Sequence, residues 1–227
     1  MAVSILVKQT SNLYLRNPEE SELGRKIISE SINLIVKLGF EEFTFKKLAA
    51  NIKSTEASIY RYFENKHKLL TYLISWYWAW LEYQIDYKTN NIADPIKKIK
   101  IIIKIIAESS SKDDPNSPHI DESLLHKIVV AESAKAYLTK NVDHENKAGL
   151  FANYQSLCTC ISSIIKEINP KFPYPLAMAS NLIETAHEQI FFSQHLPGLS
   201  DVPTPKNDYT QISAFLELIF FSTVKKG

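Results

Sequence analysis

The chain has 227 residues, and only 5 of them are glycine, about 2% where ~7% is typical. These glycines lie at least fifteen positions apart, at Gly24, Gly39, Gly149, Gly198 and Gly227. Dinucleotide-binding and phosphate-binding loops need glycines a few residues apart, so both classes are excluded. The net charge of +1 indicates no partner by itself, but residues 44–68 hold 6 basic and 2 acidic side chains. The first third of the chain therefore contains a modest basic focus.

The 10 prolines leave long uninterrupted tracts, such as 19–94 and 119–169. Proline breaks helix interiors, so its confinement to the gaps between such tracts is typical of helices. We therefore expect an all-α protein of one or two domains.

Cellular location is predicted from cysteine use and from apolar runs. Cys158 and Cys160 are the only cysteines, and neighbours at i and i+2 of a helix point apart, so they do not pair. This favours a reduced, cytoplasmic protein. The start of the chain does not resemble a signal peptide, and no apolar run reaches the ~18 residues of a membrane span. We expect no membrane partner.

The expected elements follow from apolar spacing, capping residues and prolines. Residues 1–20 are expected to form a flexible arm. Helices are expected over 21–38, 44–52, 55–63, from residue 65 onward, over 94–109, 121–139, 143–168, 176–195 and 208–225, with a polar loop at 109–120. The isoleucine-rich run 96–106 would also suit a strand.

Two short helices joined by a tight turn, following a longer helix, form a helix-turn-helix candidate. Ser21, Thr44, Thr55 and Asn65 are the expected N-caps. The helix over 55–63 is too short to be stable alone, and Ile59 and Phe63 are expected to anchor it inward. Its other side chains then face outward, where small residues allow close approach to bases and polar ones supply hydrogen bonds.

The order and spacing of residues 21–75 resemble the DNA-binding domain of TetR-family transcriptional regulators. The matching positions are Gly39-Phe40, Thr44, Leu48-Ala49, Thr55, Ser58 to Phe63, Asn65-Lys66 and Leu69-Leu70. The resemblance implies an N-terminal three-helix domain with a helix-turn-helix over 21–68, and a helical ligand-binding and dimerisation domain over 69–227.

The resemblance also implies which residues contact double-stranded DNA. Thr44 would cap a helix and touch a phosphate, with Lys46 beside it. Glu56, Ala57 and Ser58 would face bases, and Tyr60, Tyr62 and Lys66 would bind phosphates. We add Thr55, the cap of the second short helix, and Arg61, which supplies donors for bases and phosphates.

Three departures from the family pattern stand out. Lys53 stands where the turn usually has glycine, and Ser54 stands where it usually has an apolar residue. Near Glu56-Ala57, the family commonly has glycine or a small basic pair. Lysine at 53 would need a left-handed backbone or a reshaped turn. Glu56 could accept a hydrogen bond from a cytosine amino group.

Aromatic residues are dense in the tract 76–87, and the helices of residues 70–195 are expected to enclose a cavity for a small apolar or aromatic effector. The candidate contacts are Trp80, Tyr83, His126, Tyr154, Cys158 and His187. For each of them, packing in the core is the alternative. No cofactor is expected.

The final helix is apolar nearly all round, so it is expected to pack against its own core and against a second copy. The expected homodimer interface comprises Ala179, Ile183, Ile212, Phe215, Leu216, Ile219 and Phe220. A dimer suits a palindromic operator, from which an effector would release a repressor.

Two other functions remain open. Glu184-x-x-His187 and Glu64-x-x-His67 have the spacing of di-iron ligand pairs, which would suit a helical metalloenzyme. No clear pattern places further ligands, and no nucleophile–base pair stands out, so we expect no enzyme. The chain could instead be a helical interaction module that has lost DNA binding, which Lys53, Ser54 and Glu56 would favour.

Overall fold

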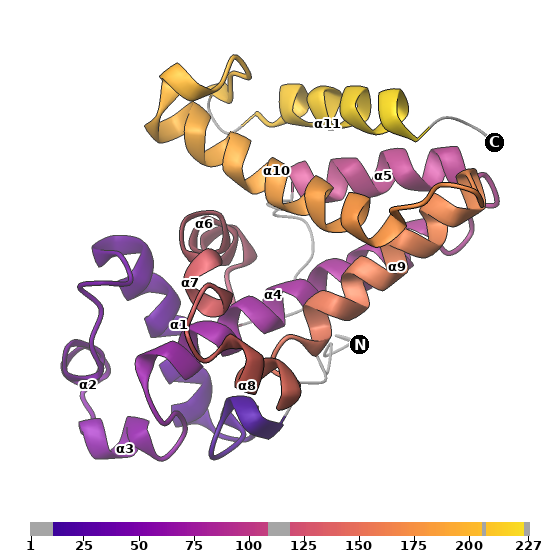
Figure 1. Cartoon of the computed structure of the whole chain (residues 1–227). Helices are drawn as coiled ribbons and strands as arrows, with labels where there is room; N and C mark the ends of the chain where they lie inside the picture. Colours follow the sequence, from indigo (N-terminus) through magenta and orange to yellow (C-terminus); the bar gives the residue numbers. More distant parts are fainter. Residues whose placement is uncertain (1–10, 109–118, 206–207, 225–227) are drawn as a thin grey trace. The chain divides into compact units, whose positions relative to one another are not determined.

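The computed structural model describes residues 11–108, 119–205 and 208–224, and every regular element within these ranges is helical (Figure 1). The all-α class expected from the sequence is confirmed. The isoleucine-rich run forms helix α5 (Pro95–Glu108) rather than a strand. Within the described ranges, none of the helices combines the length and the hydrophobicity that a membrane span requires.

The chain divides into two compact units by packing. Among the described residues, the first comprises 11–78 and 119–153, and the second comprises 79–108, 154–205 and 208–224. Helix α4 (Lys66–Thr89) contributes its first half to one unit and its second half to the other. Residues 119–153 thus pack with the N-terminal helices. The functional division at residues 20 and 68 stays a prediction.

The first unit is built around α1 (Glu22–Leu38), which packs against α2 (Phe45–Ile52) and α6 (Glu122–Glu132). α3 (Glu56–Tyr60) packs on α2. The unit also contains α7 (Ala134–Tyr137), α8 (Val142–Lys147), and two 3₁₀ turns, η1 (Ser11–Leu13) and η2 (Pro18–Glu20). Its apolar core includes Ile27, Ile28, Ile32, Phe43, Leu48, Ile59, Phe63 and Leu69.

Each of the four expected N-caps accepts a hydrogen bond from a backbone N–H one turn on. The oxygens of Ser21, Thr44, Thr55 and Asn65 bond the N–H groups of residues 24, 47, 58 and 68 at 3.0, 3.2, 3.2 and 2.9 Å. Capping satisfies donors that a helix leaves unpaired at its start. These bonds fix where α1 to α4 begin.

The N-terminal segment packs against the rest of the first unit from residue 12 onward. This differs from the flexible arm expected over 1–20. Leu13 is 1% exposed, and the Asn12 amide donates to the Ala148 carbonyl at 2.8 Å. η2 lies against α1, and the two backbones meet closely at Gly24. Residues 1–10 lie outside the described part of the chain.

Replacing Gly24 with alanine is expected to lower the free energy of unfolding by about 2 kcal/mol. A Cβ at this position would overlap the carbonyl oxygen of Pro18 and lie 2.6 Å from its Cα. These are backbone atoms, so η2 would have to shift from α1. Denaturant titration measures the change. Gly198→Ala, where a Cβ meets nothing within 4 Å, is the control, and equal midpoints for the two variants would contradict this packing.

Two long helices expected from the sequence are each interrupted. The helix over 121–139 divides into α6 and α7 at Ser133. The helix over 143–168 divides into α8 and α9 (Ala152–Ile168), because Gly149 has a φ of 79° and turns the chain. A helical apolar pattern continues across such a turn, so spacing alone does not reveal it.

In the second unit, α5, α10 (Pro175–His195) and α11 (Thr210–Thr223) pack on one another. A hydrogen bond links α9 to α4, from the Ser156 hydroxyl to Glu82 at 2.7 Å. An ion pair links α5 to α9 through Lys98 and Glu167 at 3.4 Å. A 3₁₀ turn, η3 (Pro197–Leu199), packs against α10.

Candidate DNA-binding site

Helices α2 and α3 form the helix-turn-helix unit, and its inner side is apolar as expected. Leu48, Ile59 and Phe63 are fully buried, and Ala49 is 5% exposed. α3 ends at Tyr60, three residues earlier than expected. A turn over residues 61–64 follows, which lets the adjacent Tyr62 and Phe63 both enter the core. Neighbours on a continued helix would point about 100° apart.

Lys53 adopts the left-handed conformation in the turn, with φ 56° and ψ 49°. Among the described residues it is the one non-glycine with a positive φ. The Ser54 N–H donates to the Ala49 carbonyl at 2.9 Å, which closes the helix end in the way glycine usually allows. Of the two outcomes expected for lysine at this position, the left-handed backbone is the one present.

Replacing Lys53 with glycine is expected to raise the free energy of unfolding by up to about 1 kcal/mol. A left-handed non-glycine residue costs roughly 1–2 kcal/mol, and glycine's extra entropy in the unfolded chain offsets about 0.5–1 kcal/mol of the gain. Lys37→Gly, in the last turn of α1, makes the same chemical change in a helix and is expected to be destabilising by about 1 kcal/mol. Denaturant titration compares them; the same sign for both would refute strain at Lys53.

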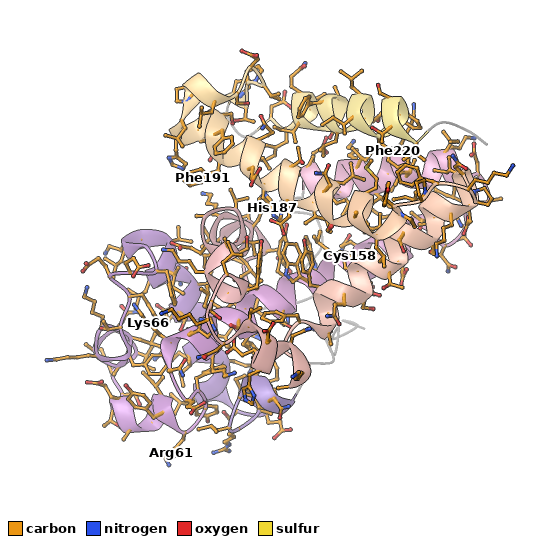
Figure 2. The ribbon with its side chains drawn as sticks, viewed as in Figure 1. Arg61, Lys66, Cys158, His187, Phe191 and Phe220 are labelled. Atoms are coloured by element: carbon orange, nitrogen blue, oxygen red, sulfur yellow. The ribbon has the colours of Figure 1, made fainter. Side chains whose placement is uncertain are left out.

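Most of the predicted DNA contacts lie on the surface of this unit. Thr44, Lys46, Thr55, Glu56, Ala57, Tyr60 and Arg61 are all exposed. The Tyr60 ring packs edge-on against Phe45 with centroids 5.0 Å apart, so its position is fixed while the side chain stays 48% exposed. The Arg61 guanidinium donates to the Ser58 hydroxyl at 3.2 Å, and Arg61 lies at the outer edge of the unit (Figure 2).

Ser58 and Tyr62 differ from the exposed positions that were expected. Ser58 is 9% exposed, and its hydroxyl lies 2.9 Å from that of Thr55. Tyr62 is 3% exposed, and its hydroxyl bonds the Ser21 hydroxyl at 2.7 Å. Tyr62 thus links the residue after α3 to the start of α1 instead of presenting its hydroxyl to a phosphate.

Lys66 also differs from its expected role at the start of α4. Its Nζ donates to the carbonyl oxygens of Phe40, Glu41 and Phe43 at 3.1, 3.0 and 3.3 Å. It lies 4.8 Å from the centroid of the Phe40 ring. The ammonium therefore holds the loop before α2, and these carbonyls stabilise a cation that would otherwise oppose the helix dipole.

Sequence reasoning missed a carboxylate that holds the same loop. Glu132, at the end of α6, is 9% exposed and accepts the Phe40 N–H at 3.2 Å. It also pairs with Lys135 at 2.8 Å, and Lys135 pairs with Glu41 at 2.8 Å. The hydrogen bond to Glu132 contributes most, and the one to Glu41 next, to a pKa of Lys135 that lies above its usual value. No local pattern indicates contacts more than ninety positions apart.

Of the predicted effector contacts, five belong to the second unit. Tyr154 donates to Glu184 at 2.6 Å, and burial together with Glu184 raises the pKa of the Cys158 thiol to about 11, which keeps it neutral. His187 and Trp80 are buried, and Tyr83 stacks on Tyr87. Glu184 is thus a polar group that the effector prediction omitted.

His126 belongs to the first unit, where it is 2% exposed and stacks on Tyr77. A surface groove of about 620 Å³ lies in the second unit where α4 leads into α5, and it is lined by residues 91–94, 97, 100 and 101. None of the predicted effector contacts lines this groove.

The predicted dimer residues divide into two groups. Ala179, Ile183, Ile212, Leu216 and Phe220 are fully buried within the chain itself. Phe215 and Ile219 are half-buried, while Leu218 is 65% exposed. The outward side of α11 is therefore centred on Leu218, a residue that the all-round apolar pattern did not single out.

The residues of the alternative metal sites have other partners. Glu184 accepts from Tyr154, and His67 lies 3.4 Å from Glu145. Within the described ranges, no group of three His, Cys, Asp or Glu side chains is arranged to hold a metal ion.

The capped helices, the left-handed turn and the exposed face of α3 define a helix-turn-helix domain. Residues 27–73 match the family model described as "Bacterial regulatory proteins, tetR family". The chain thus carries the DNA-binding domain of the TetR family of regulators, and the resemblance seen in the sequence is confirmed.

Solved structures share the fold over most of the chain. They include AibR in complex with isovaleryl coenzyme A and operator DNA (15% identity, TM-score 0.58, 89% of this chain and 100% of that one). The fatty acid degradation regulator FadR from Bacillus halodurans has 15% identity and a TM-score of 0.58, with coverage of 88% and 93%. The superantigen PfiT has 13% identity and a TM-score of 0.59, with coverage of 93% and 100%. No curated protein sequence matches the chain. These identities establish the fold alone.

Proposed function

We propose that this protein is a ligand-responsive repressor that binds a palindromic operator as a homodimer in the bacterial cytoplasm. The observation that carries the proposal is the exposed face of α3, on which Glu56, Ala57 and Tyr60 point outward, with Arg61 exposed directly after it. The cap and the preceding turn of this helix are fixed by contacts within the protein. A rigid helix with short and polar outward side chains suits the major groove.

Duplex binding is tested by selecting bound fragments from the source genome, followed by titration at several salt concentrations. We expect affinity to fall steeply with salt, because contacts to phosphates release counterions. Failure to bind any duplex would favour the interaction-module alternative. Recovered fragments with two inverted half-sites would support binding as a dimer, and a reporter gene placed behind such a fragment would distinguish repression from activation.

Replacing Tyr60 with phenylalanine is expected to weaken duplex binding about tenfold. The ring would keep its contact with Phe45, while the hydroxyl, which supplies a hydrogen bond to phosphate worth about 1–2 kcal/mol, would be lost. Tyr174→Phe is the matched control, since Tyr174 is 68% exposed outside this domain. Equal affinities for both variants would mean that the Tyr60 hydroxyl does not contact DNA.

The dimer is proposed to form through the outward side of α11 around Leu218, together with Phe215 and Ile219. A helix with apolar residues on both its inner and outer sides is best covered on both. Sedimentation should give about twice the 25.9 kDa of one chain. Leu218→Asp should yield monomers, whereas Glu188→Asp, on an exposed part of α10, should not.

The effector is proposed to be a small apolar or aromatic molecule bound in the second unit. The burial of Cys158 and His187 supports this, with Tyr154 and Glu184 as polar groups. Because AibR was solved with isovaleryl coenzyme A, short-chain acyl thioesters are the first compounds to test, followed by free aromatic acids. A bound effector should raise the melting temperature and release DNA; no thermal shift across both sets would argue against this effector class.

A further inference from the structure

The segment just before η2 runs beside the end of α3. The Leu15 N–H donates to the Tyr62 carbonyl at 2.8 Å, and the Arg16 guanidinium lies 5.5 Å from the centroid of the Tyr62 ring. One residue earlier, the Tyr14 ring packs edge-on against Tyr72 at 6.1 Å. The path of residues 14–16 is therefore fixed by three successive contacts.

Tyr62 is a rigid platform for Arg16. It is buried, and its hydroxyl is held by Ser21 at 2.7 Å. Since Tyr62 follows the last residue of α3 by two positions, a group stacked on its ring lies at the C-terminal end of the helix proposed to enter the major groove. The Arg16 side chain is exposed at this place.

The charge around Arg16 favours an anion from outside the protein. Within the described ranges, Arg16 has no carboxylate within ion-pair distance, in contrast to Lys47 and Lys68, which pair with Glu42 and Glu145. The acidic residues next along the segment are engaged elsewhere: Glu19 bonds His119 and Tyr72, and Glu20 accepts from Asn17. A guanidinium stacked on a ring keeps its in-plane N–H donors available.

We propose that Arg16 is a DNA-contacting residue, whose guanidinium donates to a backbone phosphate beside the half-site read by α3. This inference rests on the proposed function and extends the DNA-binding surface beyond the helix-turn-helix into the preceding segment. Phosphate contacts of this kind set the register of a recognition helix rather than reading bases. Arginine suits the role because its planar donors match two phosphate oxygens at once.

Duplex binding by full-length Arg16→Gln, measured across a salt series, tests the proposal. Loss of one phosphate contact per chain is expected to weaken binding about tenfold and to reduce the slope of log affinity against log salt by about 1 per chain. The matched control is Lys37→Gln, which removes one exposed positive charge from the last turn of α1, at the opposite end of a 17-residue helix from Ser21. Lys37→Gln should leave the slope unchanged.

Two further measurements distinguish the loss of a phosphate contact from a loss of folding. Arg16→Lys retains the charge but not the planar stacking, so it should give an intermediate affinity with nearly the full slope. The melting temperatures of all variants report whether the fold is intact. If the unaltered protein binds duplex DNA and Arg16→Gln binds with the same affinity and slope, the inference is overturned while the proposed function stands. If the unaltered protein binds no duplex, both fail.

Discussion

Replacing Glu132 with alanine is expected to lower the free energy of unfolding by about 3 kcal/mol. The buried carboxylate accepts the Phe40 N–H at 3.2 Å and pairs with Lys135 at 2.8 Å. Hydrogen bonds to charged groups contribute about 1.5–3 kcal/mol each, and a buried N–H left without a partner adds its desolvation cost. The substitution also leaves a cavity, so the loss falls on α6 and on the loop before α2 together.

Two variants separate the contributions to this effect. Glu132→Gln keeps an acceptor for the Phe40 N–H and removes the charge, so we expect a loss of about 1 kcal/mol. Glu188→Ala removes an exposed carboxylate from α10 and should change stability by less than about 0.5 kcal/mol. Denaturant titrations of the three variants and the unaltered protein at pH 7 measure the differences. A loss below 1 kcal/mol for Glu132→Ala would show that the loop is held by other contacts, such as those of Lys66.

The parts of the site that were predicted correctly depend on contacts a few residues apart. Thr44 and Thr55 cap their helices through bonds to residues three positions on. The left-handed conformation of Lys53 is also set locally, because the turn requires a left-handed residue whatever its side chain. Spacing and side-chain chemistry are sufficient for such features.

The parts that were missed depend on contacts between distant residues. Lys66 reaches carbonyl groups more than twenty positions earlier, and Glu132 binds a backbone N–H ninety-two positions away. Tyr62 is polar at one end and apolar over its ring, so its burial is set by the partner it finds in Ser21. An apolar pattern on every side of a helix, as in α11, likewise leaves open which side faces the core. Which side is buried depends on how the helices pack against one another, and the sequence of a single helix does not determine this.

Lowering the pH from 7 to 5 is expected to lower the free energy of unfolding by about 2 kcal/mol through the titration of His126 alone. The imidazole is 2% exposed, and its Nδ1 lies within hydrogen-bond distance of the Tyr77 hydroxyl, at 2.8 Å. Burial lowers the pKa of His126 from its usual 6.5 to about 4, since the charged form loses its hydration.

Stability depends on pH because the folded and unfolded chains bind a proton at His126 over different pH ranges. Above pH 6.5 the imidazole is neutral in both the folded and the unfolded chain, so the stability does not depend on it. Between pH 6.5 and about 4 the unfolded chain binds a proton that the folded chain does not. Stability therefore falls as pH falls, by up to about 1.4 kcal/mol for each pH unit. Below the folded pKa the slope disappears.

Comparison with His126→Gln isolates this contribution from the titration of carboxylates. The glutamine amide oxygen can accept from Tyr77 but does not titrate, so the variant should lose about 2 kcal/mol less than the unaltered protein between pH 7 and 5. His144→Gln, at an exposed position in α8, should retain the full dependence. Denaturant titrations at pH 5, 6 and 7 provide the measurement. Parallel pH profiles for His126→Gln and the unaltered protein would mean that His126 is protonated in the folded state at pH 5, and that its site is open to water or to a compensating charge.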